Sequence, residues 1–110
     1  MVTVTMTKSL STNNGNVTLD IVIGNGQIGA STVALGAASI PSTNNHYQLG
    51  SNLTGKQVII QTVVTDVNQN TDDTIVTYNF TEGGNRQSFS NQVKVDQSGG
   101  MALYHCIASF

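Results

Sequence analysis

Apolar and polar residues alternate along most of the chain with a period of two. In the first segment Val2, Val4 and Met6 share one face of an extended chain, and the threonines between them share the other. The same alternation recurs at 17–23, 76–80 and 88–95, whereas a 3.6-residue period hardly appears. Period two is typical of strands that bury one face. The sequence therefore predicts an all-β chain.

Short segments rich in Gly and Asn separate these strands. Residues 24–27 (Gly-Asn-Gly-Gln) and 82–85 (Glu-Gly-Gly-Asn) supply the positive φ angles that tight turns need. A further turn is expected at 97–100, before a last strand at 101–110. We expect the strand at 28–35 to return antiparallel to the strand at 17–23.

Two longer segments depart from simple alternation. Residues 36–55 contain the only proline, Pro41, and are expected to form a long loop with one short strand near 46–49. Residues 57–67 are apolar on both faces, which is typical of a central strand covered on both sides. One face carries Val58, Ile60 and Val64, and the other carries Ile59, Val63 and Val67.

Seven or eight strands result, and 110 residues suffice for one core but not for two. We predict a single domain, residues 1–110, folded as an antiparallel β-sandwich in which the long middle segment crosses between the sheets. A small closed barrel is the alternative.

Charged residues make up only 9% of the chain and the net charge is −2, so the polar surface consists mainly of hydroxyls and amides. The four basic residues are scattered singly and form no stripe, which argues against nucleic acid as a partner. Neither a signal peptide nor an apolar run of membrane-spanning length is visible, so no membrane insertion is expected. The composition favours an extracellular or surface-exposed location.

Oxygen-bearing side chains stand at alternate positions in one turn, at Asp66, Asn68, Asn70 and Asp72. This spacing is similar to the first half of an EF-hand calcium loop, although Thr71 replaces the turn glycine and Thr77 the bidentate glutamate. Ordinary turns use the same residues through Asx hydrogen bonds. Calcium is the only cofactor that the sequence suggests.

One aromatic residue of the middle loop is a candidate platform for a sugar ring. Tyr47 lies among Asn44, Asn45, His46 and Gln48, whose side chains could bind hydroxyl groups. The alternative is a tyrosine that covers the edge of the core.

Catalytic residues are sparse. Cys106 lies in an alternating apolar strand, where a buried and inert thiol is expected, and the adjacent His105 points to the opposite face. His46 is the only other histidine. We therefore expect no enzymatic activity.

The function expected from these observations is a non-enzymatic structural or interaction module, a self-associating component of an extracellular or virion assembly. Residues 2–8 form a strand with little charge to block edge-to-edge pairing with a protein partner or a second copy. The alternative is a carbohydrate-binding module, with a glycan as partner and its site in the 42–55 loop.

Overall fold

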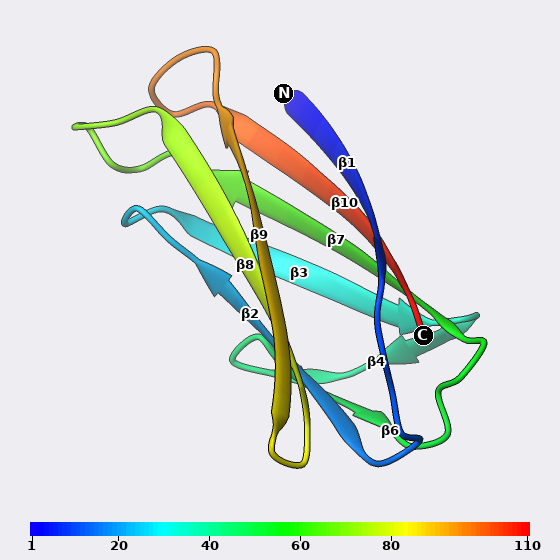
Figure 1. The fold of residues 1–110 in the computed structure, drawn as a ribbon. Coiled ribbons are helices and arrows are strands. Elements are labelled where there is room, and N and C mark those ends of the chain that lie inside the picture. Colours follow the sequence, from blue (N-terminus) through cyan, green and yellow to red (C-terminus); the bar gives the residue numbers. More distant parts are fainter.

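The computed structural model describes residues 1–110 and shows ten strands in two five-stranded sheets that pack face to face (Figure 1). The predicted β-sandwich is confirmed, and the structure is not a closed barrel. Every regular element is a strand, so no apolar helix could cross a bilayer. Sheet A consists, in spatial order, of β1 (Val2–Ser9), β10 (Met101–Ser109), β7 (Gln57–Thr65), β3 (Ile28–Leu35) and β4 (Ala38–Ile40). Sheet B consists of β5 (Ser42–Thr43), β6 (His46–Gly50), β2 (Val17–Ile23), β8 (Asp73–Glu82) and β9 (Asn85–Lys94).

Strand pairing is antiparallel except at one edge of sheet A. There β1 runs parallel to β10, with Val4 opposite Tyr104 and Met6 opposite Cys106. Figure 1 shows the two strands side by side, so the first and last segments of the chain are neighbours. Parallel pairing requires a long connection between the strands, and here the whole of the remaining chain provides it.

The connection at 24–27 differs from the predicted hairpin. Asn25 and Gly26 have the expected positive φ angles, but the chain passes there from sheet B to sheet A. β2 pairs with β6 and β8, whereas β3 pairs with β7 and β4. The turn is held by the start of β8 and by the loop before it. The Asn25 side chain donates to the carbonyl of Asp73, and the carbonyl of Asn25 accepts from the Asn68 side chain. The prediction that β3 pairs with β2 is therefore wrong.

The middle segment is more regular than expected. It contains β4, β5 and the predicted short strand, which is β6, and these additions raise the strand number above the predicted seven or eight. Pro41 stands between β4 of sheet A and β5 of sheet B, where the chain crosses between the sheets as predicted. Proline has no N–H to donate to a ladder, which suits a point where pairing stops.

Strand β7 lies in the middle of sheet A, between β10 and β3, as its apolar sequence predicts. Its inward residues are fully buried, but the outward face is not covered. Val63 is 37% exposed, and Ile59 is only half-buried. The expectation of cover on both sides is therefore wrong for the single chain.

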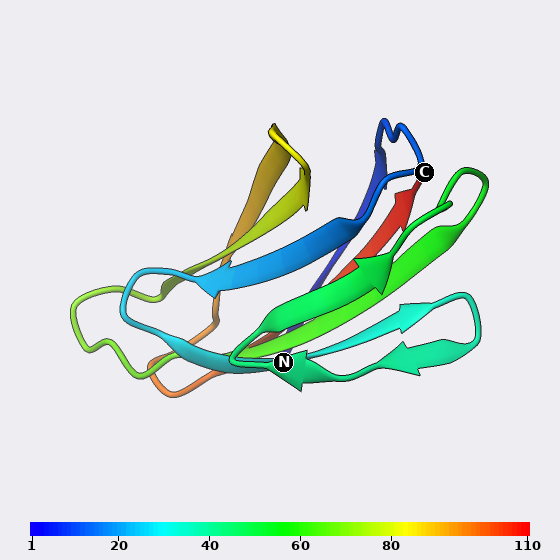
Figure 2. The same ribbon diagram turned by 90° about the horizontal axis from the view of Figure 1, so that it is seen from below.

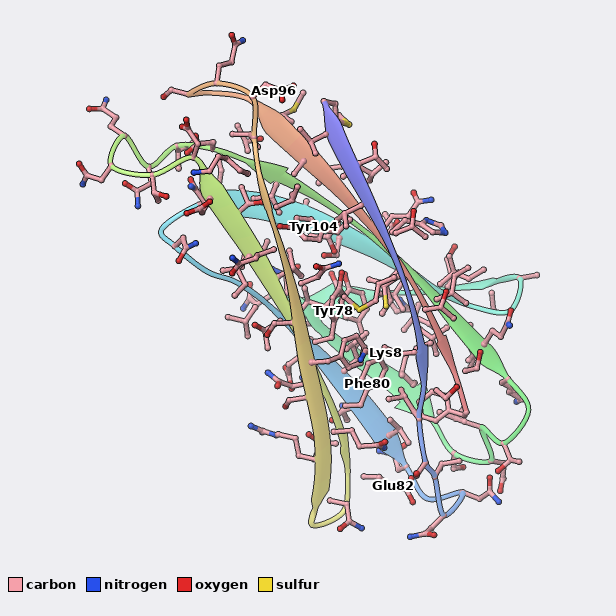
Figure 3. The ribbon with its side chains drawn as sticks, turned by 45° about the horizontal axis from the view of Figure 1, so that its top comes forward. Lys8, Tyr78, Phe80, Glu82, Asp96 and Tyr104 are labelled. Carbon is pink, nitrogen blue, oxygen red and sulfur yellow. The ribbon has the colours of Figure 1, made fainter.

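The core fills the space between the two sheets. Figure 3 shows Tyr104, Tyr78 and Phe80 following one another along the interior, with Asp96 and Glu82 towards opposite ends of the molecule. The ring of Tyr78 stacks on Phe89 of β9 with centroids 5.2 Å apart. Large aromatic side chains bury more apolar area than any others, so these rings contribute strongly to the stability of the sandwich.

The two open sides of the sandwich differ. Figure 2 shows the β8–β9 hairpin and the β3–β4 hairpin on opposite sides of the molecule. On one side the edge strands are the long β1 and β9, and on the other they are the short β4 and β5. Very short edge strands discourage pairing with another chain, so the β4–β5 side is protected and the β1–β9 side is less so.

Candidate functional site

The turn that carries the calcium candidates connects β7 to β8. The structure brings Asp66 and Asp72 close enough for the Asp66 side chain to raise the pKa of the Asp72 carboxyl group. Asn68 and Asn70 do not join them. Asn68 donates through its side chain to the carbonyl of Asn25 at 2.7 Å, and its Oδ1 accepts the N–H of Asn70. The predicted set of four ligands is thus reduced to two carboxylates, and no three His, Cys, Asp or Glu side chains converge anywhere in the molecule.

Interaction with the neighbouring Asp66 side chain is the largest cause that raises the pKa of the Asp72 carboxyl group above its ordinary value. Desolvation and the negative charge of Asp66 raise this pKa further, whereas the nearby ammonium group of Lys94 lowers it. Asp66 itself is 2% exposed, and its Oδ2 atom is buried without a hydrogen-bond partner. A buried carboxylate oxygen without a partner is rare in folded proteins.

The proposed sugar platform does not exist at Tyr47. The side chain is 1% exposed and points into the core, where its hydroxyl group donates to the carbonyl of Ser31 at 3.1 Å. Asn44 and Asn45 form the two-residue turn between β5 and β6, both with positive φ. The sugar-stacking role predicted for Tyr47 is therefore wrong, because no part of its ring faces solvent.

The remaining residues of that candidate lie on the outer face of sheet B. His46 Nδ1 is 2.6 Å from Asp20 Oδ1, and Gln48 Nε2 is 3.3 Å from His46 Nε2. These three groups form a flat polar row on the sheet surface. No aromatic ring accompanies them.

Cys106 is buried between the sheets, as its strand position predicts. Burial raises the pKa of its thiol to about 11, so little thiolate is present at neutral pH. His105 lies on the opposite face of β10, where its Nδ1 is 3.4 Å from the side-chain nitrogen of Gln61. The two adjacent residues therefore do not form a thiol–imidazole pair.

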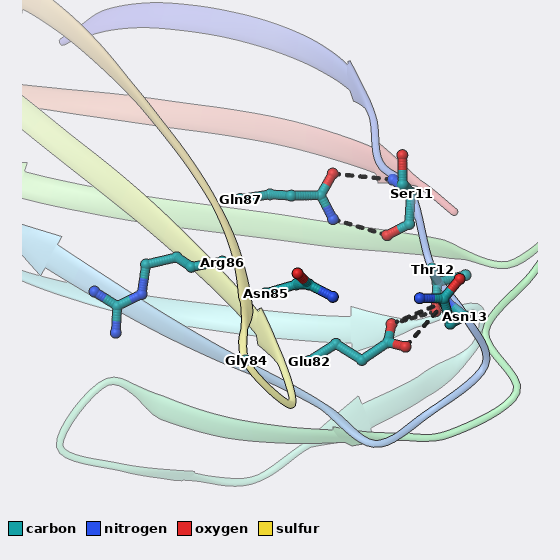
Figure 4. Close-up of a pocket in the computed structure, with 8 residues that line it drawn as sticks. All are labelled: Ser11, Thr12, Asn13, Glu82, Gly84, Asn85, Arg86 and Gln87. Atoms are coloured by element: carbon teal, nitrogen blue, oxygen red, sulfur yellow. Dashed lines mark hydrogen bonds between the residues drawn. The ribbon is translucent and has the colours of Figure 1, made fainter.

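A polar pocket of about 350 Å³ opens where the segment after β1 meets the β8–β9 hairpin (Figure 4). Most of its polar groups already bind one another. The Gln87 amide exchanges two hydrogen bonds with the backbone of Ser11, and Glu82 accepts from Thr12 and Asn13. No hydrophobic side chain lines the pocket. The polar groups of this pocket therefore serve mainly to join the segment after β1 to the β8–β9 hairpin.

The outer face of sheet A is a surface that we did not predict from the sequence. Register places Val63 between Leu103 of β10 and Ala30 of β3, and Ile59 between Ile107 and Ala34. Ile28 and Met101 extend the apolar surface at one end of the sheet, and Ile28 is 58% exposed.

This face carries no Asp, Glu, Lys or Arg side chain. Its outward positions are Thr3, Thr5, Thr7 and Ser9 of β1, alternate residues from Met101 to Ser109 of β10 and from Gln57 to Thr65 of β7, alternate residues from Ile28 to Ala34 of β3, and Ser39 of β4. The outer face of sheet B, by contrast, carries Asp20, Asp73, Arg86 and Lys94. The apolar outward residues of β7 are the sequence signal that points to this surface.

Comparison with known protein families, curated proteins and solved structures finds no match to this chain.

Proposed function

We propose that this protein is a non-enzymatic structural module that associates with further copies of itself through the outer face of sheet A. The proposal rests on the difference between the sequence of β7 and its surroundings in the fold. Its sequence is apolar on both faces, whereas the fold covers only one of them. Burying Ile59 and Val63 against a second copy would remove this apolar surface from water.

The lack of charge on the face favours a second copy as the partner. When two identical uncharged faces pack together, no like charges repel each other, and no charged side chain is buried without a partner. A strongly charged partner would find no complementary group there. The charged residues of sheet B make its outer face less suited to self-association.

The size of the face also fits a dimer contact. Four strands spaced ~4.8 Å apart and about eight residues long, at ~3.3 Å per residue, cover roughly 500 Å² in projection. Side-chain relief adds to this area. Stable interfaces bury roughly 800 Å² per partner, so the face is of the right order.

The edge strand β1 borders this face and supports the same proposal. It has a paired neighbour on one side only, and Lys8 is its single charged residue. Its exposed residues Thr3, Thr5 and Thr7 continue the neutral surface to the edge of the sheet. A partner can thus contact the face and the edge together.

The setting of this association is proposed to be an extracellular or virion assembly. What supports this part of the proposal is the composition: only 9% of the residues are charged, and hydroxyl and amide side chains make up most of the polar surface.

Two valine substitutions test the proposal. Val63→Lys places a charge at the centre of the outer face of sheet A, and Val22→Lys places the same charge on the outer face of sheet B, where Val22 is 50% exposed. Because a central interface substitution costs about 2 kcal/mol or more, Val63→Lys should weaken association at least ~30-fold. Val22→Lys should leave it unchanged.

Sedimentation velocity of both variants and the wild type gives the answer, with circular dichroism to show that both variants fold. Equal association of the Val63→Lys protein and the wild type would rule out this face as the interface.

A further inference from the structure

Three loops meet at one end of the sandwich, which is the end marked by Asp96 in Figure 3. They are residues 24–27, 66–72 and 95–100. The N–H of Asp66 donates to the carbonyl of Gly100, and the N–H of Val95 donates to the carbonyl of Asp72. Asp66, Asp72 and Asp96 lie in these loops, and Asp73 follows directly. This end of the molecule therefore gathers most of the carboxylates.

Gln27 fixes the shape of the 66–72 loop. Its side chain is buried, its Oε1 accepts the N–H groups of Val67 and Asn68, and its Nε2 donates to the carbonyls of Thr71 and Asp73. The amide therefore forms all of its hydrogen bonds with the loop and with the first residue of β8. The loop is held in place before any ligand arrives.

One carboxylate oxygen in the 66–72 loop has no hydrogen-bond partner. Asp66 Oδ1 accepts the N–H of Asn68 at 3.2 Å, but Oδ2 is buried and has no hydrogen-bond partner. The Asp72 carboxyl group is a close neighbour of the Asp66 side chain. Lys94 does not fill the gap, since its ammonium group pairs with Asp73 at 3.2 Å. A cation bound here would offset the negative charge of the buried carboxylate and of the carboxyl group beside it.

We propose that a calcium ion binds between the carboxylates of Asp66 and Asp72. Calcium takes oxygen ligands only and tolerates irregular geometry, and the two neighbouring side chains here are both carboxylates. Water and loop carbonyls would complete the coordination. Asn68 and Asn70 are not ligands, because their side chains face Asn25 and solvent.

Affinity should be weak. With two carboxylates, the site belongs with calcium sites of about 10⁻⁴–10⁻³ M, the range of extracellular modules. Binding is independent of the outer face of sheet A, so either proposal can fail without the other.

The test compares thermal unfolding in calcium chloride, in chelator, and in sodium chloride of matched ionic strength, together with calorimetric titration of calcium chloride. The wild type should show saturable heat for one site and a melting temperature that rises with calcium concentration. Asp72→Asn, at a partly exposed position, should fold and lose both responses. Asp96→Asn, which removes an exposed carboxylate on the neighbouring loop, should keep them.

Asp66→Asn is a second test variant. Calorimetric titration at a temperature where this variant is folded should also detect no calcium binding. The proposal is overturned if the wild type shows neither saturable heat nor a calcium-dependent melting temperature. It is equally overturned if Asp72→Asn responds as the wild type does.

Discussion

Two buried tyrosines connect the sheets through their hydroxyl groups. Tyr47 of sheet B donates to the carbonyl of Ser31 in sheet A at 3.1 Å. Tyr104 of sheet A donates to the carbonyl of Thr74 in sheet B at 2.9 Å, and its oxygen lies 2.6 Å from Thr74 Oγ1. Desolvation raises the pKa of Tyr104. Because a buried hydroxyl group without a partner is costly, these bonds favour one alignment of the two sheets.

Substitutions of Tyr47 test its place in the core. Tyr47→Phe keeps the ring and leaves the carbonyl of Ser31 without its donor, so it should cost about 1–2 kcal/mol of unfolding free energy. Tyr47→Ala also leaves a cavity and should cost about 3–5 kcal/mol, by analogy with other aromatic-to-alanine changes in cores. Urea denaturation measures both. An alanine variant as stable as the wild type would instead place the side chain on the surface.

The sequence around Tyr47 explains why its role was mistaken. The polar neighbours from Asn44 to Gln48 suggest a solvent-exposed loop. Tyr47 and Leu49, however, are two residues apart and share the inward face of β6. The alternation was present, but five residues are too few for it to stand out against a polar background.

At the scale of elements, Glu82 clamps the segment after β1 to the end of β8. Its carboxylate accepts the hydroxyl group of Thr12 at 2.6 Å and the N–H groups of Asn13 and Gly15 at 3.0 and 3.2 Å. The Thr12 bond lowers the pKa of Glu82 most, partial desolvation opposes it, and the two backbone bonds lower it further. The clamp holds the link between β1 and sheet B.

Glu82→Gln should lower the melting temperature at neutral pH, because a neutral amide accepts these bonds more weakly than a carboxylate. A group whose pKa is lowered by folding stabilises the protein above its ordinary pKa, here 4.5, and the stabilisation is lost as the pH falls through the lowered value. The difference between the wild type and Glu82→Gln should therefore shrink below pH 4.5.

Melting curves across this pH range measure the effect, with Asp96→Asn as the control for removing an exposed carboxylate. A difference that stays constant down to the most acidic pH would show that the charge of Glu82 is not what holds the clamp.

Strand positions were largely predictable, whereas strand partners were not. Alternation located β1, β2, β8 and β9 because one face of each is less exposed than the other along most of its length. Pairing depends on groups far apart in the sequence. The Gly-Asn-Gly-Gln turn at 24–27 has the local geometry of a hairpin, but Gln27 and Asn25 bind the 66–73 segment, and the chain changes sheets there. β4 and β5 are too short to show any period.

At the scale of the whole molecule, the two outer faces and the two open sides are unequal. One outer face is neutral and partly apolar, and the other carries charges of both signs. One side ends in short strands and the other in the long β1 and β9. The sequence of β7 predicted two covering layers, but a sequence pattern does not say whether the second layer belongs to the same chain. We propose that self-association supplies the missing layer.

The mass of the wild-type protein in solution tests this most directly. Sedimentation equilibrium over a wide range of concentration should give a mass that rises from the 11.6 kDa of one chain to at least twice that value. A mass of 11.6 kDa at every concentration would mean that the outer face of sheet A faces only water, and the proposed function would be wrong.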